Sequence, residues 1–174
     1  LPKYLKKSCM TNPVVLVTGG TGSFGTVLTK TLEERGIRPL LVSRNGPVKA
    51  DLGQKYFGWK KDEYESLAEK VTHILHAAAT TRFTHPLGVA RKLNVDLTRN
   101  VLEFAKRCLN LQVFGHVSTA FVAGKRIGRI LESELEHEQG FVNTYEQSKY
   151  ETEIMVKEYA RKLPIVILRP SIID

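Results

Sequence analysis

Tyr145 and Lys149 have the types and spacing that acid-base chemistry uses. They lie four residues apart near the start of an amphipathic helical pattern, so the phenol and the ammonium share one helix face. A free tyrosine, with a pKa of about 10, is a poor acid-base catalyst at neutral pH, but a neighbouring ammonium favours the phenolate and lowers that pKa. A YxxxK pattern by itself occurs often by chance. The prediction therefore depends on the residues that accompany it.

A pair of hydroxyl residues, Ser118 and Thr119, follows at the end of a predicted strand over residues 113–118. Hydroxyls at the carboxyl edge of a sheet are placed to hold a substrate carbonyl oxygen. Either residue of the pair can take this role, and the sequence leaves the choice open.

A glycine-rich turn with Gly19, Gly22 and Gly25 joins an apolar strand pattern, residues 14–18, to a helical pattern, residues 23–35. Glycines let the backbone approach a pyrophosphate, and the free N–H groups at the helix N-terminus favour its charge. In this context the turn predicts a nicotinamide dinucleotide site.

Arg44 follows the second predicted strand, residues 38–43. An acidic residue at this position accepts hydrogen bonds from the adenosine 2′-hydroxyl of NAD, whereas an arginine pairs with the 2′-phosphate of NADP. The sequence therefore favours NADP over NAD as cofactor.

The wider pattern alternates strands with helices, which predicts an α/β fold with a doubly wound, Rossmann-like parallel sheet in three α/β/α layers. Further strands are predicted at 71–77, 113–118 and 164–169, and helices at 86–107 and 144–162. We expect residues 1–174 to form a single NAD(P)-binding domain.

One connection does not fit this scheme. Only residues 44–47 separate the second strand from a probable third strand at 48–52, whereas parallel neighbours usually need a crossover of about a dozen residues or more. Either the fold has lost this helix or the sequence omits a segment near 44–48.

The composition is that of an ordinary globular protein: 174 residues, 42% hydrophobic and 25% charged, with a net charge of +8. The basic residues are spread along the chain, so no nucleic-acid partner is expected. Cys9 and Cys108 form no metal or disulfide motif, and no metal site is predicted. We also expect no membrane span, no signal peptide within Leu1–Met10, and a cytoplasmic location. The oligomeric state is left open.

Several stretches occur in an order that resembles the extended short-chain dehydrogenase/reductases. Those nearest the predicted catalytic residues look most like the branch of thioester reductases and fatty acyl-CoA reductases. After the glycine turn, the stretches that carry the resemblance are His76–Ala79, Leu93–Thr98, His116–Gly124, Gly128–Glu132, Phe141–Lys149 and Arg169–Ser171.

The resemblance implies a role for each residue of the predicted site. Thr119, with Ser118 as its rival, would orient the carbonyl oxygen, Tyr145 would donate the proton, and Lys149 would tune Tyr145 and hold the nicotinamide ribose. Asp51, Leu52 and Ala77–Ala79 would flank the adenosine half of the cofactor, and Pro170 and Ser171 its nicotinamide end. The complete set expected at the cofactor is Gly19, Thr21, Gly22, Ser23, Phe24, Gly25, Arg44, Asp51, Leu52, Ala77, Ala78, Ala79, Tyr145, Lys149, Pro170 and Ser171.

The resulting hypothesis is an NADP-dependent reductase that delivers hydride to an acyl thioester, on coenzyme A or a carrier protein, or to the derived aldehyde. Two alternatives are a nucleotide-sugar epimerase or dehydratase or a hydroxysteroid-type dehydrogenase of the same superfamily, and a non-catalytic NAD(P)-binding module. The family continues beyond the position of Asp174, so we expect most of the C-terminal substrate portion to be lacking. Phe83, Phe121 and Phe141 border the expected cleft, where aromatic residues either line a substrate channel or pack.

Overall fold

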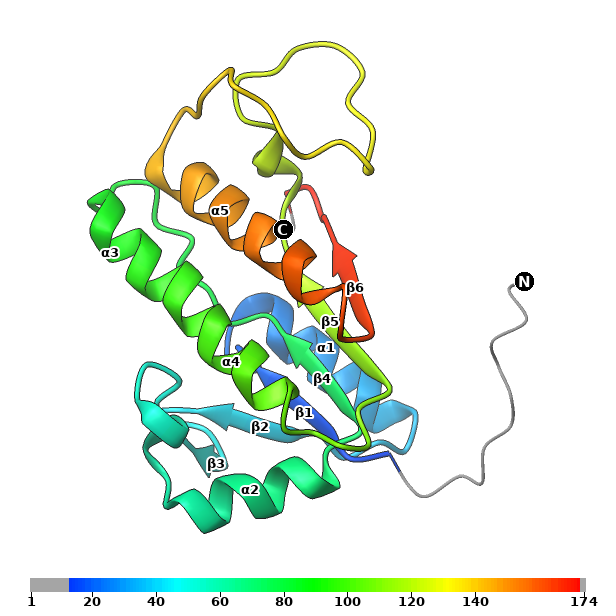
Figure 1. The fold of residues 1–174 in the computed structure, drawn as a ribbon. Coiled ribbons are helices and arrows are strands. Elements are labelled where there is room, and N and C mark those ends of the chain that lie inside the picture. The colour runs from blue at the N-terminus through cyan, green and yellow to red at the C-terminus, as the bar shows by residue number, and fades with distance from the viewer. Residues whose placement is uncertain (1–12, 173–174) are drawn as a thin grey trace.

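The computed structural model describes residues 13–172, whose six strands form one parallel sheet (Figure 1). The strand order is β3-β2-β1-β4-β5-β6, and every neighbouring pair is parallel. The doubly wound, Rossmann-like α/β fold is therefore confirmed. Cys9 and the basic segment Leu1–Met10 lie outside the described residues.

The elements follow the predicted order along the chain, with some changes in length. The strands are β1 (Val15–Thr18), β2 (Leu40–Ser43), β3 (Val48–Lys49), β4 (His73–His76), β5 (Val113–Val117) and β6 (Ile165–Leu168). The helices are α1 (Ser23–Glu34), α2 (Lys61–Lys70), α3 (Leu87–Arg91), α4 (Leu97–Ala105) and α5 (Thr144–Tyr159), with a π-helical segment η2 (Lys92–Asp96) and short 3₁₀ turns η1 (Lys55–Gly58) and η3 (Ala120–Ala123).

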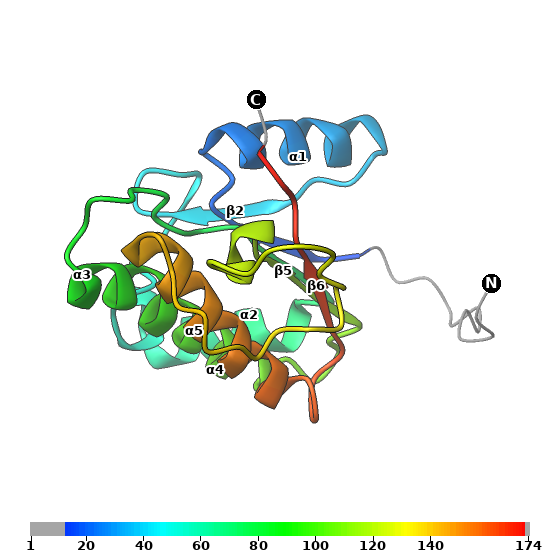
Figure 2. The ribbon, with the colours of Figure 1, turned by 90° about the horizontal axis from the view of Figure 1, so that it is seen from above.

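The helices cover both faces of the sheet, which gives the predicted three layers. Seen from above, α1 lies on one face and α2, α4 and α5 lie on the other (Figure 2). In the sheet, β2 and β3 lie on one side of β1, whereas β4, β5 and β6 lie on its other side. Right-handed crossovers in opposite directions place their helices on opposite faces. The point between β1 and β4 where the order reverses is where doubly wound sheets bind ligands.

Apolar strand residues and the inner faces of the helices form one core. All four residues of β1 are buried, as expected for a central parallel strand covered on both faces. Leu16, Ile74 and Phe114, from β1, β4 and β5, pack in one cluster with residues of α4 and α5. This cluster fixes α4 and α5 against the sheet.

The connection between β2 and β3 is only the loop Arg44–Pro47, yet the two strands pair in parallel. Val42 lies beside Val48 and Ser43 beside Lys49, so this chain has no crossover helix at this point. The predicted strand over 48–52 ends at Lys49. Ala50 N still donates to Ser43 O of β2, but the backbone then turns away, because Asp51 N donates to Phe57 O instead. The third strand is thus much shorter than predicted.

An aromatic cluster fills the space beside β3, and the sequence analysis predicted no element there. The rings of Phe57 and Tyr64 lie 5.2 Å apart, and both contact the ring of Phe104 from α4. Tyr64 lies on α2, a helix whose start carries a recognisable signal: the backbone N–H of Lys60 donates to the Glu63 carboxylate. The acidic first turn and this capping residue were the cues that the sequence analysis missed.

The predicted helix over 86–107 is not continuous α-helix. It runs as α3, the wide π-turn η2 and α4, because the Asn94 side chain in the middle is drawn into contacts outside the helix. Its Nδ2 donates to Ser148 Oγ at 2.8 Å and its Oδ1 accepts from Thr80 N at 2.8 Å. Such π-bulges occur often at functional sites, and this one joins the loop after β4 to α5.

Candidate active site

Thr119, Tyr145 and Lys149 lie together at the carboxyl edge of the sheet. Thr119 lies two residues after the end of β5, and its side chain is close enough to that of Tyr145 on α5 to lower the pKa of the phenol. One turn further along α5, Lys149 Nζ donates to the carbonyl oxygen of Val117 at 2.8 Å. All three side chains are buried. The fold therefore brings together the residues that the two sequence patterns predicted separately.

The hydroxyl of Ser118 points to a different partner from that of Thr119. Successive residues of an extended chain point to opposite sides, and Ser118 Oγ donates to the Glu153 carboxylate at 2.5 Å. Ser118 is thus committed to a buried hydrogen bond, whereas Thr119 is beside Tyr145. The geometry separates the two rivals that the sequence left open.

Glu153 is a fully buried carboxylate that the sequence analysis did not single out. Arg169, at the end of β6, binds it through Nε at 3.0 Å and Nη2 at 2.5 Å, and the Arg169 side chain is only 10% exposed. With Ser118 this pair links β5, α5 and β6. The signal that could have found it is the position of Glu153, one helical turn after Lys149 on the same face.

Burial shifts the pKa values of Lys149 and Tyr145. Burial lowers the pKa of Lys149 to about 8, against the opposing pull of the Glu153 carboxylate. Burial raises the pKa of Tyr145, and the hydrogen bond from Thr119 offsets only part of that rise. The direction of this shift is opposite to the lowering of the Tyr145 pKa that the sequence predicts. The physical reason is that the phenol is desolvated while the ammonium is directed at the Val117 carbonyl.

Two buried histidines stack beside this site, on β4 and β5. The rings of His76 and His116 are 5.7 Å apart, and each side chain is 1% exposed. His76 bonds Thr18 Oγ1 and Thr98 Oγ1, whereas neither ring nitrogen of His116 has a partner among residues 13–172. Burial and the nearby Lys149 lower the pKa of His76 to about 3 and also lower that of His116, so both rings are neutral. Both histidines are therefore residues of the core.

The glycine turn lies at the reversal point of the sheet and packs on the loop after β4. Gly19 has a φ of +74°, and a Cβ there would come within 2.6 Å of the backbone of Ala77 and Ala78. A Cβ on Gly25 would overlap the Gly19 carbonyl oxygen, so α1 can start close to the turn only with glycine. No acidic residue lies in the first turn of α1. The turn and helix N-terminus therefore fit a dinucleotide phosphate.

The remaining predicted cofactor residues are spread along the same edge. Arg44 is exposed immediately after β2. Asp51 accepts from Gly53 N at 3.0 Å, and the Leu52 side chain is buried in the core, which leaves only its backbone accessible. Thr21, Ser23 and Ser171 are exposed, and Phe24, Ala77, Ala78 and Pro170 are half-buried, with Ala79 exposed.

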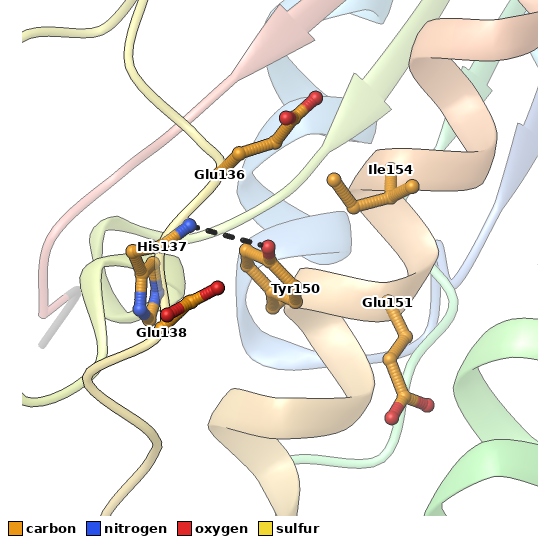
Figure 3. Close-up of a pocket in the computed structure, with 6 residues that line it drawn as sticks. All are labelled: Glu136, His137, Glu138, Tyr150, Glu151 and Ile154. Carbon is orange, nitrogen blue, oxygen red and sulfur yellow. Dashed lines mark hydrogen bonds between the residues drawn. The ribbon is translucent and has the colours of Figure 1, made fainter.

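An open hollow of about 700 Å³ lies away from these residues (Figure 3). It is lined by Glu136, His137, Glu138, Tyr150, Glu151 and Ile154. His137 N donates to Tyr150 Oη at 3.4 Å, which attaches the loop residues Glu136, His137 and Glu138 to α5. Within the described range, no group of three or more potential metal ligands comes together. No helix in that range is long and apolar enough to cross a membrane.

A family model described as Male sterility protein, an NAD-binding family, matches residues 30–174. The chain belongs to this family. The matched region begins inside α1, after the glycine turn. The interpretation of the turn therefore depends on its backbone geometry and not on the family match.

Fatty acyl-CoA reductases are among the curated relatives. Fatty acyl-CoA reductase wat of Drosophila melanogaster is 30% identical, over 91% of this chain and 42% of its own length. Fatty acyl-CoA reductase 1 of Arabidopsis thaliana is 26% identical, over 84% of this chain and 40% of its own length. The chain thus spans about two fifths of these relatives. The Drosophila alignment covers 219 positions, more than the 174 residues here, so that relative has internal residues that this chain lacks.

The terminal R domain of the myxalamid PKS-NRPS pathway is similar in structure, with a TM-score of 0.81 and 29% identity over 91% of this chain and 48% of that one. A UDP-N-acetylglucosamine 4-epimerase from Bacillus cereus has a TM-score of 0.73 at 22% identity, covering 91% of this chain and 60% of that one, a likeness of fold alone. Together with the family match, these findings confirm the resemblance to the thioester-reductase branch of the extended short-chain dehydrogenase/reductases.

Replacing Glu153 by Gln is expected to destabilise the fold by about 3 kcal/mol, because it leaves the buried Arg169 guanidinium without its counter-charge. Chemical denaturation measures the effect. The matched control is Glu151→Gln, whose pair with Arg91 lies at the surface and should cost much less. Adding Arg169→Met to Glu153→Gln should recover part of the loss. If both glutamate variants lost the same free energy of unfolding, the buried ion pair would contribute no more to stability than the surface pair.

Acid should destabilise the protein below pH 6.5, because the buried, neutral His116 has a lowered pKa and the unfolded chain binds the proton more readily. Stability therefore falls as the pH drops from 6.5. In His116→Leu, which has a similar volume, this loss between pH 6.5 and 4 should be smaller than in the wild type. Denaturation curves across that range test it, and an unchanged pH slope would contradict it.

Proposed function

We propose that this chain is the cofactor-binding part of an NADP-dependent reductase that acts on the carbonyl of an acyl thioester or the derived aldehyde. The observation that carries the proposal is the meeting of Thr119, Tyr145 and Lys149 at the sheet edge. Residues 1–174 would act as a single NAD(P)-binding domain. A module that only bound the dinucleotide would not need all three side chains together.

The glycine turn and the N-terminus of α1 would hold the pyrophosphate, which the close backbone packing and the lack of acidic residues support. Arg44 would pair with the 2′-phosphate, which is why we propose NADP over NAD. Ala77 to Ala79 would lie along the adenosine half, with Pro170 and Ser171 near the nicotinamide end. The bound cofactor would supply the hydride.

The catalytic residues would divide the remaining work. The hydroxyls of Thr119 and Tyr145, which lie beside each other, would both donate to the carbonyl oxygen of the substrate. Tyr145 would then deliver its proton to that oxygen. The raised pKa of Tyr145 keeps the phenol protonated, which suits a proton donor in the reductive direction. Lys149 would hold a ribose hydroxyl and stabilise the phenolate that forms.

The substrate class is supported by the relatives. Several are named fatty acyl-CoA reductases, and the R domain is the terminal unit of a PKS-NRPS pathway. We propose coenzyme A or a carrier protein as the group that bears the acyl chain. Hydride addition and proton transfer would give a hemithioacetal. Its C–S bond would then break, which releases the carrier thiol and leaves an aldehyde, or an alcohol after a second reduction.

Tyr145→Phe should reduce thioester-dependent NADPH oxidation by about 10²-fold or more, because the proton donor is lost. The protein, alone and within a longer parent chain, is mixed with NADPH and octanoyl-CoA, and nicotinamide absorbance is followed. NADPH binding, measured by fluorescence, should persist in the variant. A wild type that binds NADPH but consumes none with any thioester would overturn the reductase proposal and favour a binding module. Turnover that survives the change would remove Tyr145 from the mechanism.

Arg44→Asp should reverse the cofactor preference. The carboxylate would repel the 2′-phosphate of NADPH and accept hydrogen bonds from the 2′-hydroxyl of NADH. The ratio of the Kd for NADH to that for NADPH should fall by about tenfold or more, since a charge-assisted hydrogen bond contributes about 1.5–3 kcal/mol. Arg35→Asp, an equal charge change at the far end of α1, is the control. If the ratio of the two Kd values fell equally in Arg44→Asp and Arg35→Asp, the effect would come from the net charge alone.

A further inference from the structure

His76 lies buried between the glycine turn and the helix that carries Tyr145. It is the last residue of β4 and pairs with Thr18, the last residue of β1. One ring nitrogen, Nδ1, is 2.6 Å from Thr18 Oγ1, and the other, Nε2, is 2.9 Å from Thr98 Oγ1 on α4. The imidazole therefore connects the residue that precedes the glycine turn to a helix that packs on one face of the sheet.

The partners of the His76 ring fix the direction of each hydrogen bond. Burial lowers the pKa of His76 to about 3, so the ring is neutral and carries one N–H. Thr98 Oγ1 donates its single hydrogen to the carbonyl oxygen of Asn94 at 2.6 Å, so it accepts from His76 Nε2. Nδ1 is then the acceptor, and Thr18 Oγ1 donates to it. The Thr18 hydroxyl in turn accepts from Ala78 N at 3.4 Å.

The same series of hydrogen bonds continues from Asn94 to the backbone of Tyr145. Asn94 Nδ2 donates to Ser148 Oγ at 2.8 Å, and Ser148 Oγ donates to the carbonyl oxygen of Tyr145 at 2.9 Å. We call the side chains that form this series the buried bridge. Each of its members is at most 2% exposed: Thr18, His76, Thr98, Asn94 and Ser148.

The buried bridge contacts the proposed site at both ends. Its first member directly precedes Gly19 of the turn, and its last member bonds the peptide of Tyr145. When a buried hydrogen bond loses one partner, the other is left unpaired because water does not reach it, so each link restricts the position of both groups that it joins. Order in the glycine turn and order at the start of α5 therefore depend on the same series of bonds.

We propose that His76 is a positioning residue for both halves of the site. Its Nδ1 holds Thr18 and with it the glycine turn that would bind the dinucleotide. Its Nε2 holds, through the rest of the buried bridge, the backbone of Tyr145, the proposed proton donor. This inference rests on the proposed function and adds to it a residue that acts on cofactor binding and on proton transfer through its neighbours.

Two substitutions of His76 separate the two sides of the ring, because the amide of asparagine lies near the position of Nδ1 and that of glutamine near the position of Nε2. His76→Asn can accept from Thr18 but does not reach Thr98. The kcat for reduction of octanoyl-CoA should fall about tenfold, with an unchanged Kd for NADPH. His76→Gln can donate to Thr98 but loses Thr18. The Kd for NADPH should rise about tenfold, with an unchanged kcat at saturating NADPH.

Thr18→Val and Thr98→Val repeat this separation without altering the ring, and they decide the question if either histidine variant fails to fold. Thr18→Val should raise the Kd for NADPH about tenfold and leave kcat unchanged, whereas Thr98→Val should do the reverse. The matched control is His73, which lies on the same strand and bonds Thr72 Oγ1 at 2.9 Å, outside the buried bridge. His73→Asn and His73→Gln should change neither quantity.

Amide hydrogen exchange of the protein without ligands gives a readout that does not depend on turnover. Exchange at residues 148–152 should be about tenfold faster than in the wild type in His76→Asn only, and exchange at residues 19–26 in His76→Gln only. If no thioester is reduced but the exchange and the Kd values follow this pattern, the role of His76 stands and the reductase proposal fails.

A residue that only supports the fold would affect both halves of the site together. If octanoyl-CoA is reduced and the two His76 variants lose kcat and NADPH affinity to the same extent, the inference is wrong. It is equally wrong if neither variant changes either quantity, or if Thr18→Val and Thr98→Val have the same effect as each other.

Discussion

The attachment of α5 to the ends of β5 and β6 is the interaction on which the rest of the site depends. Lys149 binds the last carbonyl of β5, and Glu153 binds both Ser118 and Arg169. Because the pair is buried, its charges are compensated only by each other and by these hydrogen bonds, so α5 can adopt this position only when β5 and β6 are correctly paired. Local order at the site is thereby coupled to the long-range topology of the sheet.

The other half of the site is built by close packing. The glycine turn lies against the Ala77–Ala78 backbone at a distance that no Cβ would allow, and the Asn94 side chain ties the following loop to α5 through Ser148. This link accompanies the interruption of regular α-helix by the π-helical segment at Asn94. Through β4 the glycine turn and the cluster of Thr119, Tyr145 and Lys149 are joined in one frame, which would supply the preorganisation that the proposed reaction at a carbonyl requires.

The short β2–β3 connection alters only the edge of the sheet. The central strands β1, β4 and β5 keep complete parallel pairing, while β3 is reduced to Val48–Lys49 at the sheet edge. The aromatic cluster of Phe57, Tyr64 and Phe104 packs on the helix-rich face and covers the end of the core. Since the switch point and the catalytic edge lie on the far side of β1 from β3, the predicted catalytic residues are unaffected by this change.

The sequence by itself determined what is local: the strand–glycine turn–helix unit, the Tyr145–Lys149 face and the hydroxyls at the end of a strand follow from residue type and period. It also showed that the crossover between the second and third strands is unusually short, although not how the chain connects them. Only the tertiary structure showed that Ser118 bonds Glu153 while Thr119 lies beside Tyr145, revealed the buried pair of Glu153 and Arg169, and buried Tyr145 where desolvation raises its pKa. The physical reason is that hydrogen-bond partners and desolvation depend on residues distant in sequence, which neither spacing nor composition specifies.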